Sequence, residues 1–146
     1  MNVSSSAGHL SRIPGEHLRN ILASPDLTEE KLSSLITSFV KYVVLIHVEI
    51  SSHMSRMKTK CIRSWFRAAK DGIHIQEGWP NSAYVVSKVG VSALTRIQQR
   101  ELLKDENRPD IVVNHVHPGY VDTDMTSHKG HLTIEQGASL EYSSLI

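Results

Sequence analysis

One apolar run in the second half of the chain restricts the fold more than any other feature. Ile111 to Val116 is almost continuously apolar, and the turn-forming sequence His117-Pro118-Gly119 follows it at once. Runs of this kind are typical of parallel strands that are buried on both faces of a sheet. Such a sheet needs helices packed against it. The run therefore predicts an α/β fold with a parallel sheet.

Helical patterns surround this run. The segment from Thr28 to Val40 follows Asp26-Leu27-Thr28-Glu29, which has the form of a capping box. A second helix is expected from Ser82 to about Lys104, and a third from Gln136 to Ile146. Apolar residues share one helical face in the first two, namely Leu32, Leu35, Ile36, Phe39 and Val40, then Ala83, Val86, Gly90, Ala93, Leu94 and Ile97. We expect a strand to end at Val3 to Ser6, and a loop from Ile73 to Asn81.

Composition argues against several kinds of partner. The chain has 146 residues, of which 40% are hydrophobic, and a net charge of +1, too small to drive nucleic-acid binding by bulk electrostatics. Its single cysteine, Cys61, cannot form an internal disulfide, which fits a reducing compartment. Met1 to Ser6 lacks the features of a secretory signal. The most apolar stretch, Phe39 to Ile50, contains charges and is shorter than the roughly 20 residues of a membrane span. We expect a cytoplasmic protein without a membrane partner.

The charge is concentrated in one block. Residues 41–66 hold five basic residues and one acidic residue, a net charge of +4, so the remainder is acidic. The block begins with a β-like run, Tyr42 to Ile46, becomes polar and basic, and has no turn or cap signals. Three interpretations stay open: a solvated basic face, an inserted foreign segment, or a patch for nucleic acid or membrane.

Tyr84 and Lys88 form the first candidate site. They lie four residues apart on a predicted helix, so their side chains share a face. An ammonium near a phenol favours the phenolate, and a tyrosine in that setting can exchange a proton with a carbonyl or alcohol oxygen. The spacing also occurs by chance, and a simple surface pair is the alternative.

Two further segments point to the same place. Asn2-Val3-Ser4-Ser5 brings hydroxyl groups to the end of a predicted strand, and Pro118-Gly119-Tyr120-Val121-Asp122-Thr123 follows the apolar strand. The carboxyl ends of parallel strands meet at one edge of a sheet, where α/β proteins bind ligands. The alternatives are a serine that caps a turn and an ordinary strand-to-helix turn.

Together these segments resemble the short-chain dehydrogenase/reductase family, and within it the monomeric NADPH-dependent carbonyl reductases. The resemblance covers residues 1–40 and 67–146. Its matching segments, in family order, are Asn2-Val3-Ser4-Ser5, Asp26 to Val40, Glu77-Gly78-Trp79-Pro80-Asn81-Ser82-Ala83-Tyr84-Val85-Val86-Ser87-Lys88, Asn114, Pro118-Gly119-Tyr120-Val121 and Thr123-Asp124-Met125. It implies a partial Rossmann-like, doubly wound parallel sheet, equivalent to the C-terminal half of a reductase.

The resemblance also implies roles for individual residues. Ser5 would bond the substrate carbonyl oxygen, Tyr84 would be the general acid, and Lys88 would favour the phenolate and hold the nicotinamide ribose. The backbone of Pro118, Gly119, Val121 and Thr123 would support the nicotinamide, while Ala83 and Tyr120 would line the substrate pocket. The implied reaction is NADPH-dependent reduction of small aldehydes, ketones or quinones to alcohols by a monomer. NADPH rather than NADH, and which carbonyl compound is reduced, come from the resemblance alone.

One family feature is absent. The family's Thr-Gly-x-x-x-Gly-x-Gly turn, which receives the pyrophosphate, cannot be built from the eight glycines of this chain. We therefore interpret residues 1–146 as an incomplete domain that would be inactive in isolation. The alternative function is a truncated, non-catalytic polypeptide that cannot bind cofactor alone.

The histidines do not change this interpretation. His115 and His117 would share a strand face, and His128 and His131 have a spacing at which they could bind metal with Asp124. The family uses no metal, and we predict none.

Residues 41–66 are hypothesised to be a foreign insertion, such as an in-frame retained intron. Removing them would join Val40 directly to Arg67, as the family pattern expects. Sequencing of the transcripts tests this: the major message should join codon 40 to codon 67. An unbroken exon across 41–66 in every transcript would contradict the hypothesis.

Overall fold

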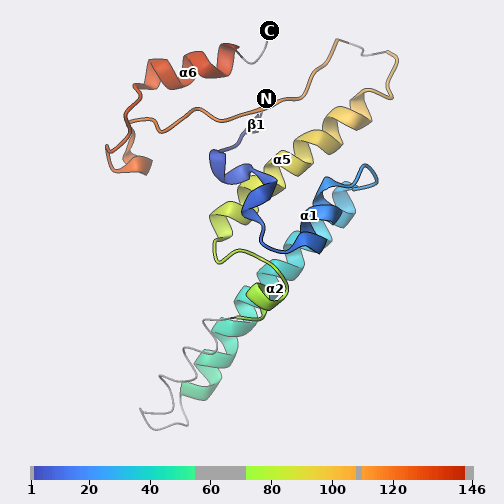
Figure 1. Ribbon diagram of the computed structural model, residues 1–146, viewed down its shortest axis with the longest axis vertical. Helices are drawn as coiled ribbons and strands as arrows, with labels where there is room; N and C mark the ends of the chain where they lie inside the picture. Colours follow the sequence, from blue (N-terminus) through green and yellow to red (C-terminus); the bar gives the residue numbers. More distant parts are fainter. Residues whose placement is uncertain (1, 55–71, 108–109, 144–146) are drawn as a thin grey trace. The chain divides into compact units, whose positions relative to one another are not determined.

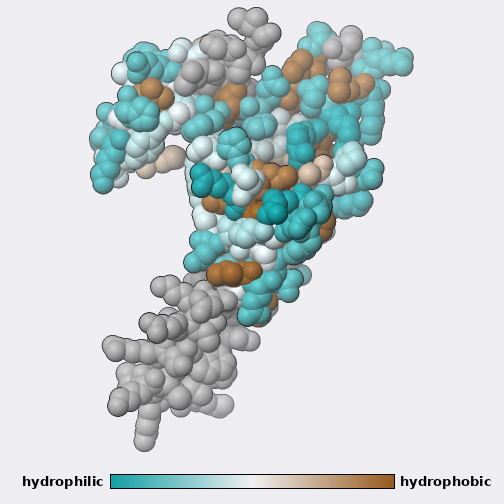
Figure 2. All heavy atoms as spheres, in the orientation of Figure 1, coloured by the Kyte–Doolittle hydropathy of each residue, from teal (hydrophilic) through white to brown (hydrophobic). Residues whose placement is uncertain are grey.

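A computed structural model describes residues 2–54, 72–107 and 110–143 (Figure 1). The chain forms two compact units. One comprises Met1–Arg12 with Tyr84–Ile146, and the other comprises Ile13–Ala83. Among the helices in these described ranges, none is long and apolar enough to cross a membrane. Hydrophobic residues reach the surface at several separate places among hydrophilic ones (Figure 2).

The first unit contains the expected parallel strand pair. Strand β1 (Asn2–Val3) pairs with β2 (His115–Val116), so that Asn2 lies opposite His115 and Val3 opposite Val116. The Asn2 amide donates to the Asn114 carbonyl at 2.8 Å, and the Ser4 amide donates to the Val116 carbonyl at 2.7 Å. The two strands join segments from opposite ends of the chain.

The apolar run is a shorter strand than its sequence predicts. Only His115 and Val116 are assigned as strand, while the side chains of Ile111 and Val112 are 41% and 63% exposed. The physical reason is that β1 extends over two residues, so the start of the run has no partner in the described two-stranded sheet. The prediction of a parallel strand is confirmed, but that of a buried six-residue strand is wrong.

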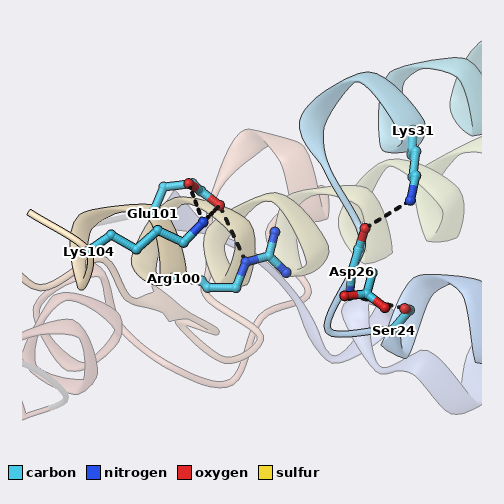
Figure 3. Close-up of polar contacts among 6 residues, drawn as sticks. All are labelled: Ser24, Asp26, Lys31, Arg100, Glu101 and Lys104. Atoms are coloured by element: carbon cyan, nitrogen blue, oxygen red, sulfur yellow. Dashed lines mark hydrogen bonds and ion pairs between the residues drawn. The ribbon is translucent and has the colours of Figure 1, made fainter.

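Helix α5 (Ala83–Leu102) confirms the second predicted helix. Its buried residues are Val86, Val89, Ala93, Thr95 and Ile97, whereas Ala83 is exposed. Near the C-terminal end of α5, two cations lie close to the Glu101 carboxylate: the Lys104 ammonium at 2.8 Å and the Arg100 guanidinium at 3.4 Å (Figure 3). The hydrogen bond from Lys104 lowers the pKa of Glu101. These contacts are exposed, so they contribute little stability.

Helix α6 (Ile134–Ser143) confirms the third predicted helix but begins two residues earlier than expected. Thr133 accepts a hydrogen bond from the Gln136 amide at 3.2 Å, and the Gln136 side chain accepts one from the Thr133 amide at 2.8 Å. This reciprocal pair is a capping box. Hydrogen bonds from the backbone of Glu135 and from Thr133 lower the pKa of Glu135.

The second unit is helical in its described residues, with α1 (Glu16–Ala23), α2 (Glu29–Met54) and α4 (Ile73–Gln76). Helix α2 starts where the sequence predicts, but Thr28 rather than Asp26 provides the cap, since its hydroxyl accepts from the Lys31 amide at 3.3 Å. Lys31 in turn donates to the Asp26 carbonyl at 3.2 Å (Figure 3). Hydrogen bonds from the backbone of Glu30 and from Thr28 lower the pKa of Glu30.

Helix α2 corrects the β-like interpretation of Tyr42 to Ile46. These residues continue the helix, which runs to Met54. Extending an existing helix adds one hydrogen bond for each residue fixed and avoids the cost of a new nucleus, so a β-branched run can follow a well-capped start. Residues 55–66 lie outside the described residues, and the proposed insertion at 41–66 stays a prediction.

An aromatic cluster forms the core beside the short helix α4, which replaces part of the loop expected from Ile73 to Asn81. Trp79 is 2% exposed and Phe39 is 5% exposed, and their ring centroids are 5.4 Å apart. The ring of buried His74 meets that of Phe39 edge-on at 6.0 Å. Gly78, at a φ of +84°, accepts a hydrogen bond from the Gly15 amide at 2.8 Å. A Cβ on Gly78 would lie 2.6 Å from the Gly15 Cα, so this approach requires glycine.

Removing the Trp79 ring should destabilise this unit strongly. Trp79→Ala is expected to lower the free energy of unfolding by about 3–5 kcal/mol, because it leaves a cavity against Phe39. Ile75→Ala is the control, since Ile75 lies on α4 but is 43% exposed, and it should cost below ~1.5 kcal/mol. Urea denaturation followed by circular dichroism measures both. Equal effects of the two substitutions would contradict the packing described.

Candidate active site

Ser5 lies two residues after the end of β1, in an extended conformation. It is the N-cap of a 3-10 turn at Ser6–Gly8, and its hydroxyl accepts a hydrogen bond from the Ala7 amide at 3.2 Å. The capping role that the sequence left open is therefore present. A hydroxyl that accepts one bond keeps its own O–H free to donate.

Tyr84 and Lys88 lie on one face of the first turns of α5, as their spacing predicts. Tyr84 is 52% exposed. The Lys88 ammonium lies 5.7 Å from the centroid of the Tyr84 ring, within the range of a cation–π contact. The same ammonium donates to the Val3 carbonyl at 3.1 Å. Lys88 thus connects the tyrosine to β1, the strand that leads to Ser5.

Further polar contacts fix α5 against β1. The Asn2 side chain donates to the Thr95 hydroxyl at 2.8 Å, and Thr95 donates to the Val91 carbonyl at 2.8 Å. Thr95 is 2% exposed. Sequence reasoning missed Thr95, because a hydroxyl on an apolar helix face gives no indication of its partner.

The loop after β2 turns sharply at Gly119, whose φ of +85° confirms the predicted turn. Beyond it, Val121 forms a parallel bridge with Leu132, and the Asp122 amide donates to the Leu132 carbonyl at 2.8 Å. A Cβ on Gly130 would lie 2.1 Å from the Val121 carbonyl carbon. Only a glycine permits the two chain segments to approach this closely.

The Thr126 hydroxyl organises the centre of this loop. It lies 2.7 Å from the Val121 carbonyl and 2.9 Å from the Thr123 carbonyl, and it accepts from the Thr123 amide at 3.1 Å. The family resemblance implies that the backbone of Val121 and Thr123 supports the cofactor. Thr126, which the sequence analysis did not identify, holds this backbone in place. Tyr120 is 45% exposed, and its ring lies 6.0 Å from that of His131.

His128 bridges two acidic side chains of the same loop. Its Nδ1 lies 2.8 Å from Asp122 and its Nε2 lies 3.0 Å from Asp124. The spacing of His128 and His131 does not produce a shared cluster, since His131 contacts Tyr120 instead. In the part of the chain that the structure describes, no group of three or more His, Cys, Asp or Glu residues is arranged to hold a metal ion.

The candidate catalytic residues and the loop from Pro118 to Thr123 belong to one unit, whereas Ala83 belongs to the other. Ser5 follows β1, Tyr84 and Lys88 lie on α5, and the loop from Pro118 to Thr123 follows β2. Lys88 supplies a direct contact between two of these elements. A phenol, an ammonium and a serine hydroxyl can handle a proton at an oxygen, and the phenol ring and the ammonium lie within cation–π range of each other.

Comparison with known proteins agrees with this arrangement. A family model described as short chain dehydrogenase matches residues 26–132. The chain belongs to this family. Its α/β, Rossmann-like fold is also that of salutaridine reductase from Papaver somniferum, a solved structure that matches with a TM-score of 0.65 and 26% identity, over 99% of this chain and 40% of that one.

Two curated relatives illustrate the similarity. Short-chain dehydrogenase/reductase 1 of Saponaria officinalis is 33% identical over 142 residues, which is 95% of this chain and 36% of the relative. Carbonyl reductase (NADPH) 1 of Rattus norvegicus is 33% identical over 139 residues, which is 94% of this chain and 41% of the relative. The chain thus spans about two fifths of the length of these two relatives.

Proposed function

We propose that these residues form the catalytic end of an NADPH-dependent carbonyl reductase, with Ser5, Tyr84 and Lys88 as its catalytic residues. The observation that carries the proposal is the position of the Lys88 ammonium, between the Tyr84 ring and the strand that leads to Ser5. The names of the relatives favour the same chemistry, since one of them is a carbonyl reductase that uses NADPH.

Each side chain has a defined task in this proposal. Tyr84 donates a proton to the carbonyl oxygen of an aldehyde, ketone or quinone, and its half-exposed side chain lets a substrate approach. Ser5 donates its O–H to the same oxygen. This O–H is available because the bond to Ala7 uses only the Ser5 oxygen as an acceptor. Lys88 holds its ammonium between the Tyr84 ring and the Val3 carbonyl, and so positions the phenol relative to β1.

The residues present fit the nicotinamide end of the cofactor. Lys88 would hold the ribose hydroxyls together with Tyr84, and the backbone from Pro118 to Thr123 would support the nicotinamide. Gly119 opens this loop at a positive φ, and Thr126 holds the Val121 and Thr123 backbone in place. When bound, NADPH supplies the hydride that reduces the carbonyl carbon. Ala83 and Tyr120, both exposed, would contact the substrate.

A second function, a polypeptide that does not bind cofactor by itself, rests on one sequence observation. The 146 residues contain no glycine-rich turn of the kind that receives a pyrophosphate at a helix N-terminus. A chain with only the nicotinamide end would lose most of the contacts to the dinucleotide. This function and the reductase function are therefore separable by binding measurements.

We expect no saturable NADPH binding by residues 1–146 alone when NADPH is titrated and its nicotinamide fluorescence is measured. A chimera that places the N-terminal part of the rat carbonyl reductase before residues 1–146 should bind NADPH and reduce menadione, because it supplies the pyrophosphate turn. In that chimera, Lys88→Ala should weaken NADPH binding about tenfold or more, whereas Lys31→Ala, at an exposed lysine of α2, should not.

Two results would contradict these expectations. Tight NADPH binding and menadione turnover by residues 1–146 alone would show that the pyrophosphate turn is not needed. A folded chimera that binds NADPH but leaves menadione unreduced would contradict the reductase function and favour the non-catalytic one.

A further inference from the structure

Ser4 is a buried hydroxyl that the proposed chemistry does not use. It is 5% exposed, and its Oγ lies 3.1 Å from the Ser92 Oγ and 3.4 Å from the Lys88 carbonyl. Ser92, on α5, donates to the Lys88 carbonyl at 3.1 Å. A buried hydroxyl is costly unless it is hydrogen-bonded. One assignment gives each O–H an acceptor: Ser4 donates to Ser92, and Ser92 donates to the Lys88 carbonyl.

Both the backbone carbonyl and the side-chain ammonium of Lys88 are thereby held near the end of β1. Its carbonyl accepts a hydrogen bond from Ser92 and lies 3.4 Å from the Ser4 hydroxyl, while its ammonium donates to the carbonyl of Val3, the residue before Ser4. Backbone groups alternate between the two edges of a strand. Because the Ser4 amide is bonded to β2, the Val3 carbonyl faces the other edge, where the Lys88 ammonium meets it.

Gly8 shows how closely the chain is packed at this point. A Cβ on Gly8 would lie 2.5 Å from the Ser4 Oγ, 2.9 Å from the Ser92 Oγ and 3.0 Å from the Lys88 carbonyl oxygen. The 3-10 turn that Ser5 caps ends at Gly8. The turn that begins at Ser5 therefore ends against the same three oxygen atoms.

We propose that Ser4 and Ser92 are positioning residues, which set the register of α5 on β1 and so place the Lys88 ammonium relative to Tyr84 and Ser5. Their catalytic meaning rests on the proposed function, but their effect on Lys88 does not. The two hydroxyls are coupled, because the hydrogen bond between them is lost when either is removed.

Acetylation of individual lysines with acetic anhydride, measured by peptide mass spectrometry on residues 1–146, tests this directly. Ser4→Ala and Ser92→Ala should each speed the acetylation of Lys88 about fivefold, the effect of losing one hydrogen bond of ordinary net strength. Lys129, an exposed lysine of the same unit, should react at an unchanged rate. Ser92→Ala keeps the test usable if Ser4→Ala does not fold, since alanine is well tolerated within a helix.

Ser87→Ala is the matched control. It removes a hydroxyl from the same helix, but one that bonds the Tyr84 carbonyl at 2.8 Å instead of reaching β1. It should leave the rate at Lys88 unchanged. The double variant Ser4→Ala/Ser92→Ala should have an effect smaller than the two single effects combined, because each single variant already loses the hydrogen bond between the two hydroxyls.

Unchanged Lys88 acetylation in the single variants, or additive effects in the double variant, would overturn the positioning role. The reaction needs neither cofactor nor substrate, so its outcome is independent of turnover. If the variants show faster acetylation of Lys88 but the chimera lacks reductase activity, the positioning role is supported and only the proposed function is contradicted.

Discussion

The short parallel ladder between β1 and β2 is the interaction on which the candidate site depends. Two backbone hydrogen bonds, from Asn2 to Asn114 and from Ser4 to Val116, join segments from opposite ends of the chain. Because parallel strands place their carboxyl ends at one edge, Ser5 and the loop after Val116 emerge on the same side. Without this ladder, the loop and the serine would have no defined relation.

Helix α5 adds the remaining groups, and polar rather than apolar contacts fix its register on β1. Val86, Val89 and Ala93 are buried on α5, and the hydrophobic effect that favours their burial is non-directional. Hydrogen bonds from Asn2 to Thr95 and between Ser4 and Ser92 are directional, so they select one register. In the positioning role that we propose, the placement of Tyr84 and Lys88 follows from hydroxyl groups that are not themselves candidate catalytic residues.

Local patterns in the sequence predicted the elements that local physics controls. The spacing of apolar residues located α5, and the glycine after Pro118 located the turn at positive φ. The extent of β2 could not be predicted, since it depends on how far its partner strand reaches. The helical course of Tyr42 to Ile46 depends on a helix already begun at Glu29, and the partners of Ser4 and Thr126 exist only in the folded chain.

Turnover by a Tyr84→Phe variant of the chimera tests the central claim most directly. Phenylalanine keeps the ring beside Lys88 but removes the only proton that Tyr84 can donate. The account predicts that menadione reduction falls at least about a hundredfold, while NADPH binding is nearly unchanged and a Tyr42→Phe control on α2 stays fully active. Reduction at the rate of the unsubstituted chimera would contradict the assignment of Tyr84 as the proton donor.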